Sequence, residues 1–219
     1  MREVPAVRVK MGTSDKVGFI VAELKNKYEV ADCALEYQDE PYKLLILARL
    51  SAQCTDERVN AVSRGLFREF KSLEAFAGCD LGKLERAVYS CGLHRTKARN
   101  IKDMCAMLLG EFGGEVPEAM ADLLRLPGVG RKIANLIRGD IFGLPAIVAD
   151  THCIRVSNRL GLCDSVSPAK VERRLLELIP ADESNAFCHR LVFFGREYCR
   201  AQSPRCGECF LAGVCEFKL

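Results

Sequence analysis

Apolar residues recur at helical rather than alternating spacing along almost the whole chain. Clear examples are the sets Val17, Val21, Leu24, Tyr28 and Val59, Val62, Leu66, Phe70. Residues three or four apart lie on one face of an α-helix, where they can be buried together. Because no alternating run bounded by turn residues is long enough for a sheet, the sequence predicts an all-α protein of about ten short helices.

Helix start and stop signals divide this pattern. Ser72 and Asp80 are suited to cap the helices that follow them, and Ser167-Pro168 is typical of a helix start. Gly113-Gly114 is typical of a helix end. No linker rich in serine, glycine or proline separates the helices, so we expect any second domain to pack closely with the first.

With 219 residues, the chain is long enough for one large or two small domains. Its apolar runs are far shorter than the roughly 20 residues that span a bilayer, so we expect no membrane segment. Four charged residues precede the first apolar run and argue against a secretory leader: Arg2, Glu3, Arg8 and Lys10. We therefore expect a cytoplasmic protein, in which the twelve cysteines are free thiols or metal ligands.

Positive charge is concentrated in one part of the chain. The formal net charge is only +3, too small to indicate nucleic acid by itself. Residues 131–160 alone carry five basic side chains and only two acidic ones. The basic residues are Arg131, Lys132, Arg138, Arg155 and Arg159, and the acidic residues are Asp140 and Asp150. This stretch is predicted to supply a basic surface.

Residues 122–138 read DLLRLPGVGRKIANLIR and predict a helix ending at Leu126, a tight turn, and a second helix from about Arg131. Gly128 and Gly130 permit positive φ and leave the backbone amides uncovered. Together with the helix N-terminus and Arg131, these amides would bind a phosphate. A plain helical hairpin remains open as the alternative, whereas a nucleotide P-loop does not fit the spacing.

Lys132 lies two residues after this turn and is a candidate nucleophile. A lysine attacks an electrophilic sugar carbon only when desolvation or a neighbouring cation keeps its amine neutral. Asp150 stands at a predicted helix start, where a carboxylate could stabilise a developing sugar cation or accept a proton. A solvated lysine and a simple capping aspartate remain the alternatives, and His152 is as consistent with a phosphate or solvent contact as with catalysis.

Four cysteines lie within the last part of the chain, at positions Cys199, Cys206, Cys209 and Cys215. Four soft thiolates in a short loop suit a [4Fe-4S] cluster, with zinc or unrelated thiols as alternatives. Arginines in the same loop, Arg196, Arg200 and Arg205, would present cations to phosphates. The other eight cysteines are scattered among apolar residues and are predicted to be buried, free thiols.

The motifs LPGVGRK, ADTH and C-x6-C-x2-C-x5-C occur here in an order that resembles endonuclease III, a family of helix-hairpin-helix DNA glycosylases and abasic-site lyases. LSAQCTDERVN and CGLHRTKARNI resemble further segments of that family, and the resemblance runs from about Leu44 to Glu216. It implies an all-α, two-domain fold. A six-helix barrel would span residues 34–145, and residues 1–33 and 146–219 would form a discontinuous iron–sulfur domain.

The resemblance also implies roles for single residues. Lys132 would attack C1′ of a flipped nucleoside, form a Schiff base and drive β-elimination, and Asp150 would assist it. Gln53 would fill the gap left in the duplex, and Leu93 would hold the kinked DNA open. The remaining DNA-binding candidates are Gly128, Gly130, Arg131 and His152. The implied partner is double-stranded DNA with an oxidised pyrimidine or an abasic site, bound by a monomer that is associated with the nucleoid if the source is bacterial.

Three other interpretations fit parts of the sequence. An adenine-excising glycosylase of the same superfamily usually lacks the lysine and carries an added C-terminal domain. In a non-catalytic DNA-binding module the hairpin and the cluster loop would only bind phosphates, and a ferredoxin-like electron carrier would leave most of the chain unexplained. Ala149, Ile133 and His94 depart from the family pattern. They border the expected cleft and leave the substrate range open.

Overall fold

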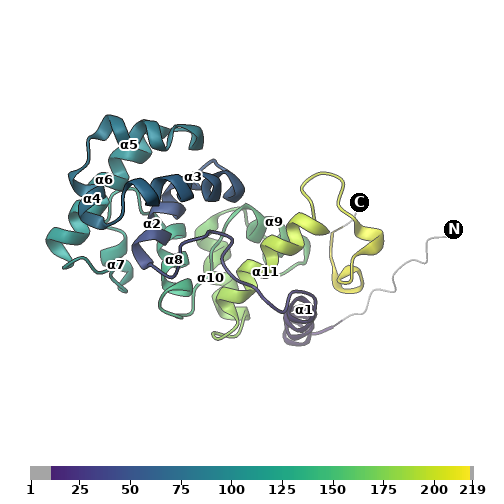
Figure 1. The fold of residues 1–219 in the computed structure, drawn as a ribbon. Coiled ribbons are helices and arrows are strands. Elements are labelled where there is room, and N and C mark those ends of the chain that lie inside the picture. The colour runs from purple at the N-terminus through teal and green to yellow at the C-terminus, as the bar shows by residue number, and fades with distance from the viewer. Residues whose placement is uncertain (1–10, 218–219) are drawn as a thin grey trace. The chain divides into compact units, whose positions relative to one another are not determined.

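The computed structural model describes residues 11–217, so the four charged residues before them, Arg2, Glu3, Arg8 and Lys10, lie outside the described part. Within it the α-helices are α1 Thr13–Lys27, α2 Pro41–Leu50, α3 Asp56–Glu69, α4 Leu73–Gly78, α5 Leu81–Ala87, α6 His94–Glu111, α7 Met120–Leu123, α8 Arg131–Asp140, α9 Thr151–Arg159, α10 Pro168–Leu178 and α11 Ser184–Glu197 (Figure 1). Single 3-10 turns cover Tyr89–Cys91, Cys206–Glu208 and Ala212–Val214. These residues form no strand, so the all-α prediction is confirmed. None of the described helices is long and apolar enough to cross a membrane.

The predicted helix boundaries hold where the signal is local. The side chain of Ser72 accepts a hydrogen bond from the Ala75 amide, and that of Asp80 accepts one from the Lys83 amide. Gly113 and Gly114 follow α6 with positive φ, as expected for a helix end. Ser167 occupies the N-cap position of α10, but its side chain makes no capping hydrogen bond.

The described chain divides into two compact units. The continuous unit is Cys33–Phe142 and contains α2 to α8. Its central element is α2, in which every residue from Leu44 to Leu47 is fully buried. α2 packs against α3, α6 and α8, while α4 and α5 cover α6. The ring of Phe76 in α4 stacks on that of Phe70, with the ring centroids 5.1 Å apart.

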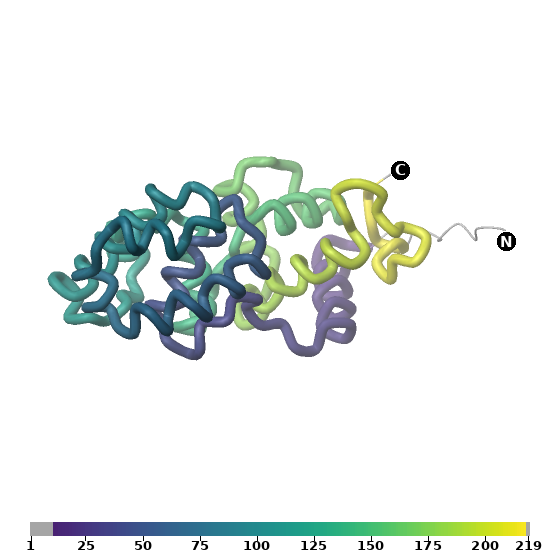
Figure 2. Tube along the Cα trace, turned by 45° about the horizontal axis from the view of Figure 1, so that its top comes forward, coloured from purple at the N-terminus to yellow at the C-terminus, as the bar shows by residue number. Residues whose placement is uncertain are grey.

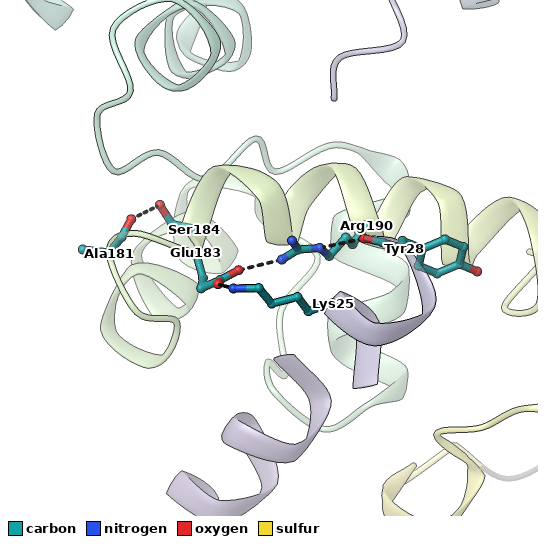
Figure 3. Close-up of polar contacts among 6 residues, drawn as sticks. All are labelled: Lys25, Tyr28, Ala181, Glu183, Ser184 and Arg190. Carbon is teal, nitrogen blue, oxygen red and sulfur yellow. Dashed lines mark hydrogen bonds and ion pairs between the residues drawn. The ribbon is translucent and has the colours of Figure 1, made fainter. Parts of the chain in front are cut away.

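The split unit combines the described residues up to Asp32 with those from Gly143 onward. α1, drawn in purple, packs on α11, and α9 packs on the same helix (Figures 1 and 2). Charged side chains also connect α1 to α11. Lys25 of α1 pairs with Glu183, which accepts a 2.6 Å bond from Arg190 of α11, and Arg190 also donates to the Tyr28 carbonyl at 3.2 Å (Figure 3).

Candidate functional site

The turn between α7 and α8 contains two glycines with different roles. α7 ends at Leu123, three residues before the predicted end, and a turn follows over Leu124 and Arg125. Gly128 has a φ of 80°, and a Cβ there would lie 2.7 Å from the Arg49 Nε and 2.9 Å from the Asn100 Cβ. Gly130 is the extended N-cap of α8, with a φ of −100°. Of the two glycines that permit positive φ, Gly128 therefore adopts it and Gly130 does not.

A partly buried arginine supports this turn. Nε and Nη2 of Arg49 donate to the Asn100 Oδ1 at 3.1 and 2.9 Å, which joins α2 to α6 directly under Gly128. Burial lowers the pKa of the Arg49 guanidinium. The guanidinium stays charged at neutral pH, so it adds positive potential behind the turn amides. Neither Arg49 nor Asn100 was among the residues predicted from the sequence to have a role.

α8 begins directly after the turn and presents Arg131 and Lys132 to solvent. Both side chains are exposed on its first turn, whereas Ala134, Asn135 and Ile137 on the opposite face are buried. The apolar face therefore fixes the rotation of the helix. Lys132 extends beside the helix N-terminus, where backbone amides and the helix dipole attract anions.

Gln53 and Leu93 both lie in tight turns of the continuous unit and adopt a backbone conformation unusual for their residue types. Their φ angles are 56° and 48°, in the left-handed region. Such strain at residues without a glycine's freedom is typical of functional positions. Leu93 is also 55% exposed, unusual for a large apolar side chain beside a core.

Lys97 holds these two turns together. Its ammonium donates to the carbonyls of Leu50, before the first turn, and of Cys91, before the second, at 2.8 and 2.7 Å. The residue is completely buried, and burial lowers its pKa. A lysine in an amphipathic helix is expected to lie on the solvent-exposed face, so no role was predicted for Lys97 from the sequence. Its position in the KA segment of CGLHRTKARNI was the available signal.

In the split unit, Asp150 begins α9. Its Oδ1 accepts a 2.7 Å bond from the Cys153 amide, which confirms the predicted helix start. His152 lies two residues on, with its Nδ1 3.0 Å from Nη2 of Arg155. A Cβ at Gly195 would come within 2.6 Å of that ring nitrogen, so α11 carries a glycine where it passes the histidine.

Two arginines of α9 bind the segment that carries the four cysteines. Arg155 donates to the carbonyls of Cys199 and Gly195, at 3.1 and 3.2 Å. Arg159 donates to the carbonyls of Arg200 and Ala201, at 2.7 and 3.1 Å. The guanidinium groups of these two residues, which belong to the stretch predicted to supply a basic surface, thus satisfy carbonyl oxygens within the split unit.

The cysteine loop offers a donor set that fits an iron–sulfur cluster. Burial raises the pKa of Cys209 to about 11, and the thiols of Cys215, Cys199 and Cys206 raise it further, so the four sulfurs influence one another. The backbone N–H of Leu211 opposes this shift by favouring the thiolate. Sulfurs with such amide partners are typical of cluster ligands. No three His, Cys, Asp or Glu side chains within residues 11–217 are arranged as ligands of a single metal ion.

The remaining eight cysteines form no disulfide bond within residues 11–217. Half of them are buried: Cys91, Cys105, Cys153 and Cys188. The other half are only partly covered, so the prediction of burial is wrong for Cys33, Cys54, Cys79 and Cys163. These four lie near helix ends or in loops, where apolar sequence neighbours do not guarantee a buried position.

Comparison with known proteins decides between the interpretations that the sequence left open. Residues 46–181 match the HhH-GPD superfamily of base excision DNA repair proteins, and residues 199–215 match the iron-sulfur binding domain of endonuclease III. The chain belongs to the endonuclease III family. It is 42% identical over 203 residues to the endonuclease III of Bacillus subtilis (strain 168), covering 91% of each chain. The endonuclease III of a Synechocystis species is 44% identical over 197 residues, covering 90% of each.

A solved structure of a trapped endonuclease III–DNA covalent intermediate, an estranged-adenine complex, is similar throughout. It superposes with a TM-score of 0.88 at 43% identity and covers 94% of this chain and 97% of that one. As a member of the endonuclease III family, the chain is a DNA glycosylase and abasic-site lyase with an iron–sulfur cofactor. The predictions of enzyme class and of a [4Fe-4S] cluster are confirmed, and the non-catalytic module and the electron carrier are set aside.

Proposed function

We propose that this chain removes oxidised pyrimidines from double-stranded DNA and cleaves the strand at the abasic site, with Lys132 as the nucleophile. The observation that carries the proposal is the position of Lys132, exposed on the first turn of α8 immediately after the Gly128–Gly130 turn. A phosphate bound at the turn amides would bring a deoxyribose within reach of the amine. The bound duplex would also exclude water from the amine and favour its neutral, nucleophilic form.

The proposed reaction has two stages. The Lys132 amine attacks C1′ of the extruded nucleoside, and the base departs with the electrons of the glycosidic bond and gains a proton. The nitrogen lone pair then forms the C1′=N bond of a Schiff base while the C1′–O4′ bond breaks, and the ring oxygen takes up the proton that the amine gives away. Loss of a C2′ proton expels the 3′ phosphate, which breaks the strand by β-elimination.

We assign Asp150 the carboxylate role in this reaction. One of its oxygens is engaged with the Cys153 amide, which fixes the side chain at the start of α9. A carboxylate held there would stabilise the positive charge that develops on the sugar, or accept a proton from the attacking amine. The asparagine variant keeps the capping oxygen and removes the charge, so it separates capping from catalysis.

DNA binding is assigned to both units. The strained turns would place Gln53 in the gap left by the flipped nucleoside and Leu93 as an apolar wedge. The backbone amides around Gly128 and Gly130, together with Arg131, would hold phosphates of the strand, and His152 would contact the backbone from α9. We further propose that the enzyme acts as a monomer in the cytoplasm, at the nucleoid in a bacterium, where its free cysteines stay reduced.

Borohydride trapping on abasic duplex DNA tests the assignment. The Schiff base is reduced to a stable covalent adduct in the unchanged protein, and Lys132→Ala forms none and loses more than about 10³-fold in strand cleavage. Lys170→Ala, which removes an exposed lysine of α10, serves as the matched control and traps normally. A full yield of adduct from Lys132→Ala would overturn the proposal.

A second pair of variants tests the carboxylate. Asp150→Asn is expected to fold and bind lesion DNA while losing about 10² to 10⁴-fold in turnover. Asp164→Asn, an exposed aspartate after α9, is the control for the loss of one negative charge. Unchanged turnover in Asp150→Asn would show that Asp150 is only a helix cap.

A further inference from the structure

Arg49 is a partly buried cation without an acidic partner. It lies near the C-terminal end of α2, and its Nε and Nη2 donate to the Oδ1 of Asn100 in α6 at 3.1 and 2.9 Å. Among residues 11–217, no carboxylate forms an ion pair with its guanidinium. The end of α2 contributes only a partial negative charge. The positive charge of Arg49 is therefore not neutralised within the described part of the protein.

Other covered cations of the chain have their bonding needs met inside the protein. Arg190 bonds the carboxylate of Glu183 at 2.6 Å, and the Lys97 ammonium donates to two backbone carbonyls. A guanidinium has five N–H groups, and Arg49 uses two of them on Asn100. The other three have no hydrogen-bond partner among residues 11–217. Covered charges are normally paired, so this arrangement indicates that an anion from outside the chain completes it.

Gly128 brings the hairpin turn into contact with this guanidinium. A Cβ at position 128 would lie 2.7 Å from the Nε and 2.8 Å from the Cδ of Arg49, closer than real side chains approach. The lack of a side chain therefore allows the turn backbone to lie directly against Arg49. Charges interact over about 10 Å at 0.1 M salt, so a phosphate held by the turn amides is within reach of this charge.

We propose that Arg49 is a positioning residue for DNA binding, and that its counter-ion is a phosphate of the strand held at the Gly128 turn. Asn100 orients the guanidinium through a neutral amide and so leaves its charge available. This inference rests on the proposed function of the turn and adds to it a charge from α2. It also makes a specific demand on Asn100, because an aspartate there would neutralise Arg49 inside the protein.

The variant Asn100→Asp tests this demand with the least change in shape. The side chain keeps the oxygen that accepts from Arg49 and gains the missing negative charge. Urea denaturation is expected to show no loss of stability, because a charge-assisted bond replaces a neutral one. Affinity for a duplex with a tetrahydrofuran abasic analogue, which has no base to release, is expected to fall about tenfold. Fluorescence anisotropy with the cluster-loaded, full-length protein measures this affinity.

Gln38→Glu is the matched control for the added charge. Gln38 is exposed in the same unit, and its Oε1 accepts a 2.8 Å bond from the Lys43 Nζ, so the control also places a carboxylate beside a cation. Its affinity for the analogue duplex is expected to stay within about twofold of the unchanged protein. Unchanged affinity in Asn100→Asp, or an equal loss in Gln38→Glu, overturns the proposal.

The salt dependence of binding tests the charge of Arg49 directly. Arg49→Met keeps an unbranched side chain without the charge, and the slope of log affinity against log salt should decrease by about 1. Arg49→Lys keeps the charge but not the forked contact with Asn100, so it should keep the slope. Arg68→Met, at an exposed arginine of α3, is the control. An unchanged slope in Arg49→Met, or the same decrease in Arg49→Lys or Arg68→Met, overturns the proposal. If Arg49→Met does not fold, Asn100→Asp still decides.

Single-turnover cleavage of abasic duplex separates binding from chemistry. In Arg49→Met the enzyme concentration for half-maximal rate should rise about tenfold, while the maximal rate stays within about threefold, because Arg49 acts on the bound strand and not on the reacting atoms. A lower maximal rate with an unchanged half-maximal concentration overturns the proposal. Failure of the unchanged protein to cleave would instead contradict the proposed function. The binding results with the analogue duplex would still decide the role of Arg49.

Discussion

The two units are stabilised in different ways. The continuous unit contains one large cluster of buried apolar side chains that reaches from Leu35 to Ile137. The split unit also has buried apolar residues, but its chain segments are joined by polar ties: Lys25 with Glu183 and Arg190, and Arg159 with the cysteine loop. The stability gained from apolar burial depends little on pH or on a cofactor. The stability gained from ion pairs depends on pH, and that gained from metal ligands depends on the bound cofactor.

This difference separates the functions of the two units. In the continuous unit, a rigid apolar core supports strained turns and an exposed lysine. In the split unit, α9 carries Asp150 at one end and binds the cysteine loop through two arginines along its length. The position of the carboxylate is therefore connected to the state of the loop, while the turn before Lys132 is supported by Arg49 and Asn100.

Loss of the cluster is the largest expected effect, and it should be confined to the split unit. Cys206→Ser removes one ligand, so we expect the visible iron–sulfur absorption to disappear and the loop from Cys199 onward to lose protection against hydrogen exchange. Amides of α2 to α6 should stay protected. Cys163→Ser, at a half-covered cysteine outside the loop, should keep its iron. Retention of a full cluster in Cys206→Ser would contradict the assignment of ligands.

A cavity in the apolar core is the corresponding change in the continuous unit. Phe76 is fully buried and contacts the rings of Phe70 and Phe67. Phe76→Ala should lower the free energy of unfolding by about 3–5 kcal/mol without loss of iron. Urea denaturation measures the first quantity and metal analysis the second. Phe19→Ala, at a 39% exposed position in α1, should change stability by less than about 0.5 kcal/mol.

Local signals explain which features the sequence predicted well. The caps at Ser72 and Asp80, the start of α8 at Arg131 and the start of α9 after Asp150 depend on residues within one helical turn. Both partners of such an interaction lie within a few residues of each other, so they can be recognised in the sequence. The family resemblance then named the candidate residues, because the motif order is specific even where each motif is short.

Contacts between distant segments explain what the sequence missed. Arg49 and Asn100 are 51 positions apart, and nothing near either residue predicts that their contact lies under Gly128. The burial of Lys97 depends on carbonyls of two separate turns. Left-handed φ at Leu93 is also unexpected, since that conformation is imposed by tertiary structure on a residue that disfavours it.

An intermediate effect is expected where the split unit depends on charge. Glu183 bonds Lys25 and Arg190, and these contacts lower its pKa below the ordinary value of 4.5. Arg190 is only 6% exposed at its side chain, so Glu183→Gln leaves a covered guanidinium without its carboxylate. We expect a loss of about 1–3 kcal/mol in the free energy of unfolding at neutral pH.

The pH dependence gives this prediction its sign. Because folding lowers the pKa of Glu183, its stabilisation is present above pH 4.5 and is lost as the pH falls through the folded-state value. Thermal unfolding of both proteins across this range measures the difference. The gap between them should narrow on acidification, and a gap that stays constant would show that the carboxylate charge is not responsible.

The smallest expected effect compares one serine from each unit at equivalent positions. Ser72 and Ser167 both precede a helix, but only Ser72 accepts a capping hydrogen bond, from the Ala75 amide at 3.3 Å. Ser72→Ala should therefore cost about 1 kcal/mol, and Ser167→Ala less than about 0.5 kcal/mol, in urea denaturation. α10 starts with Pro168, whose ring fixes φ and which has no amide to satisfy, so it depends less on a side-chain cap. Equal losses in the two variants would mean that the sequence position, rather than the hydrogen bond, determines the contribution of the serine.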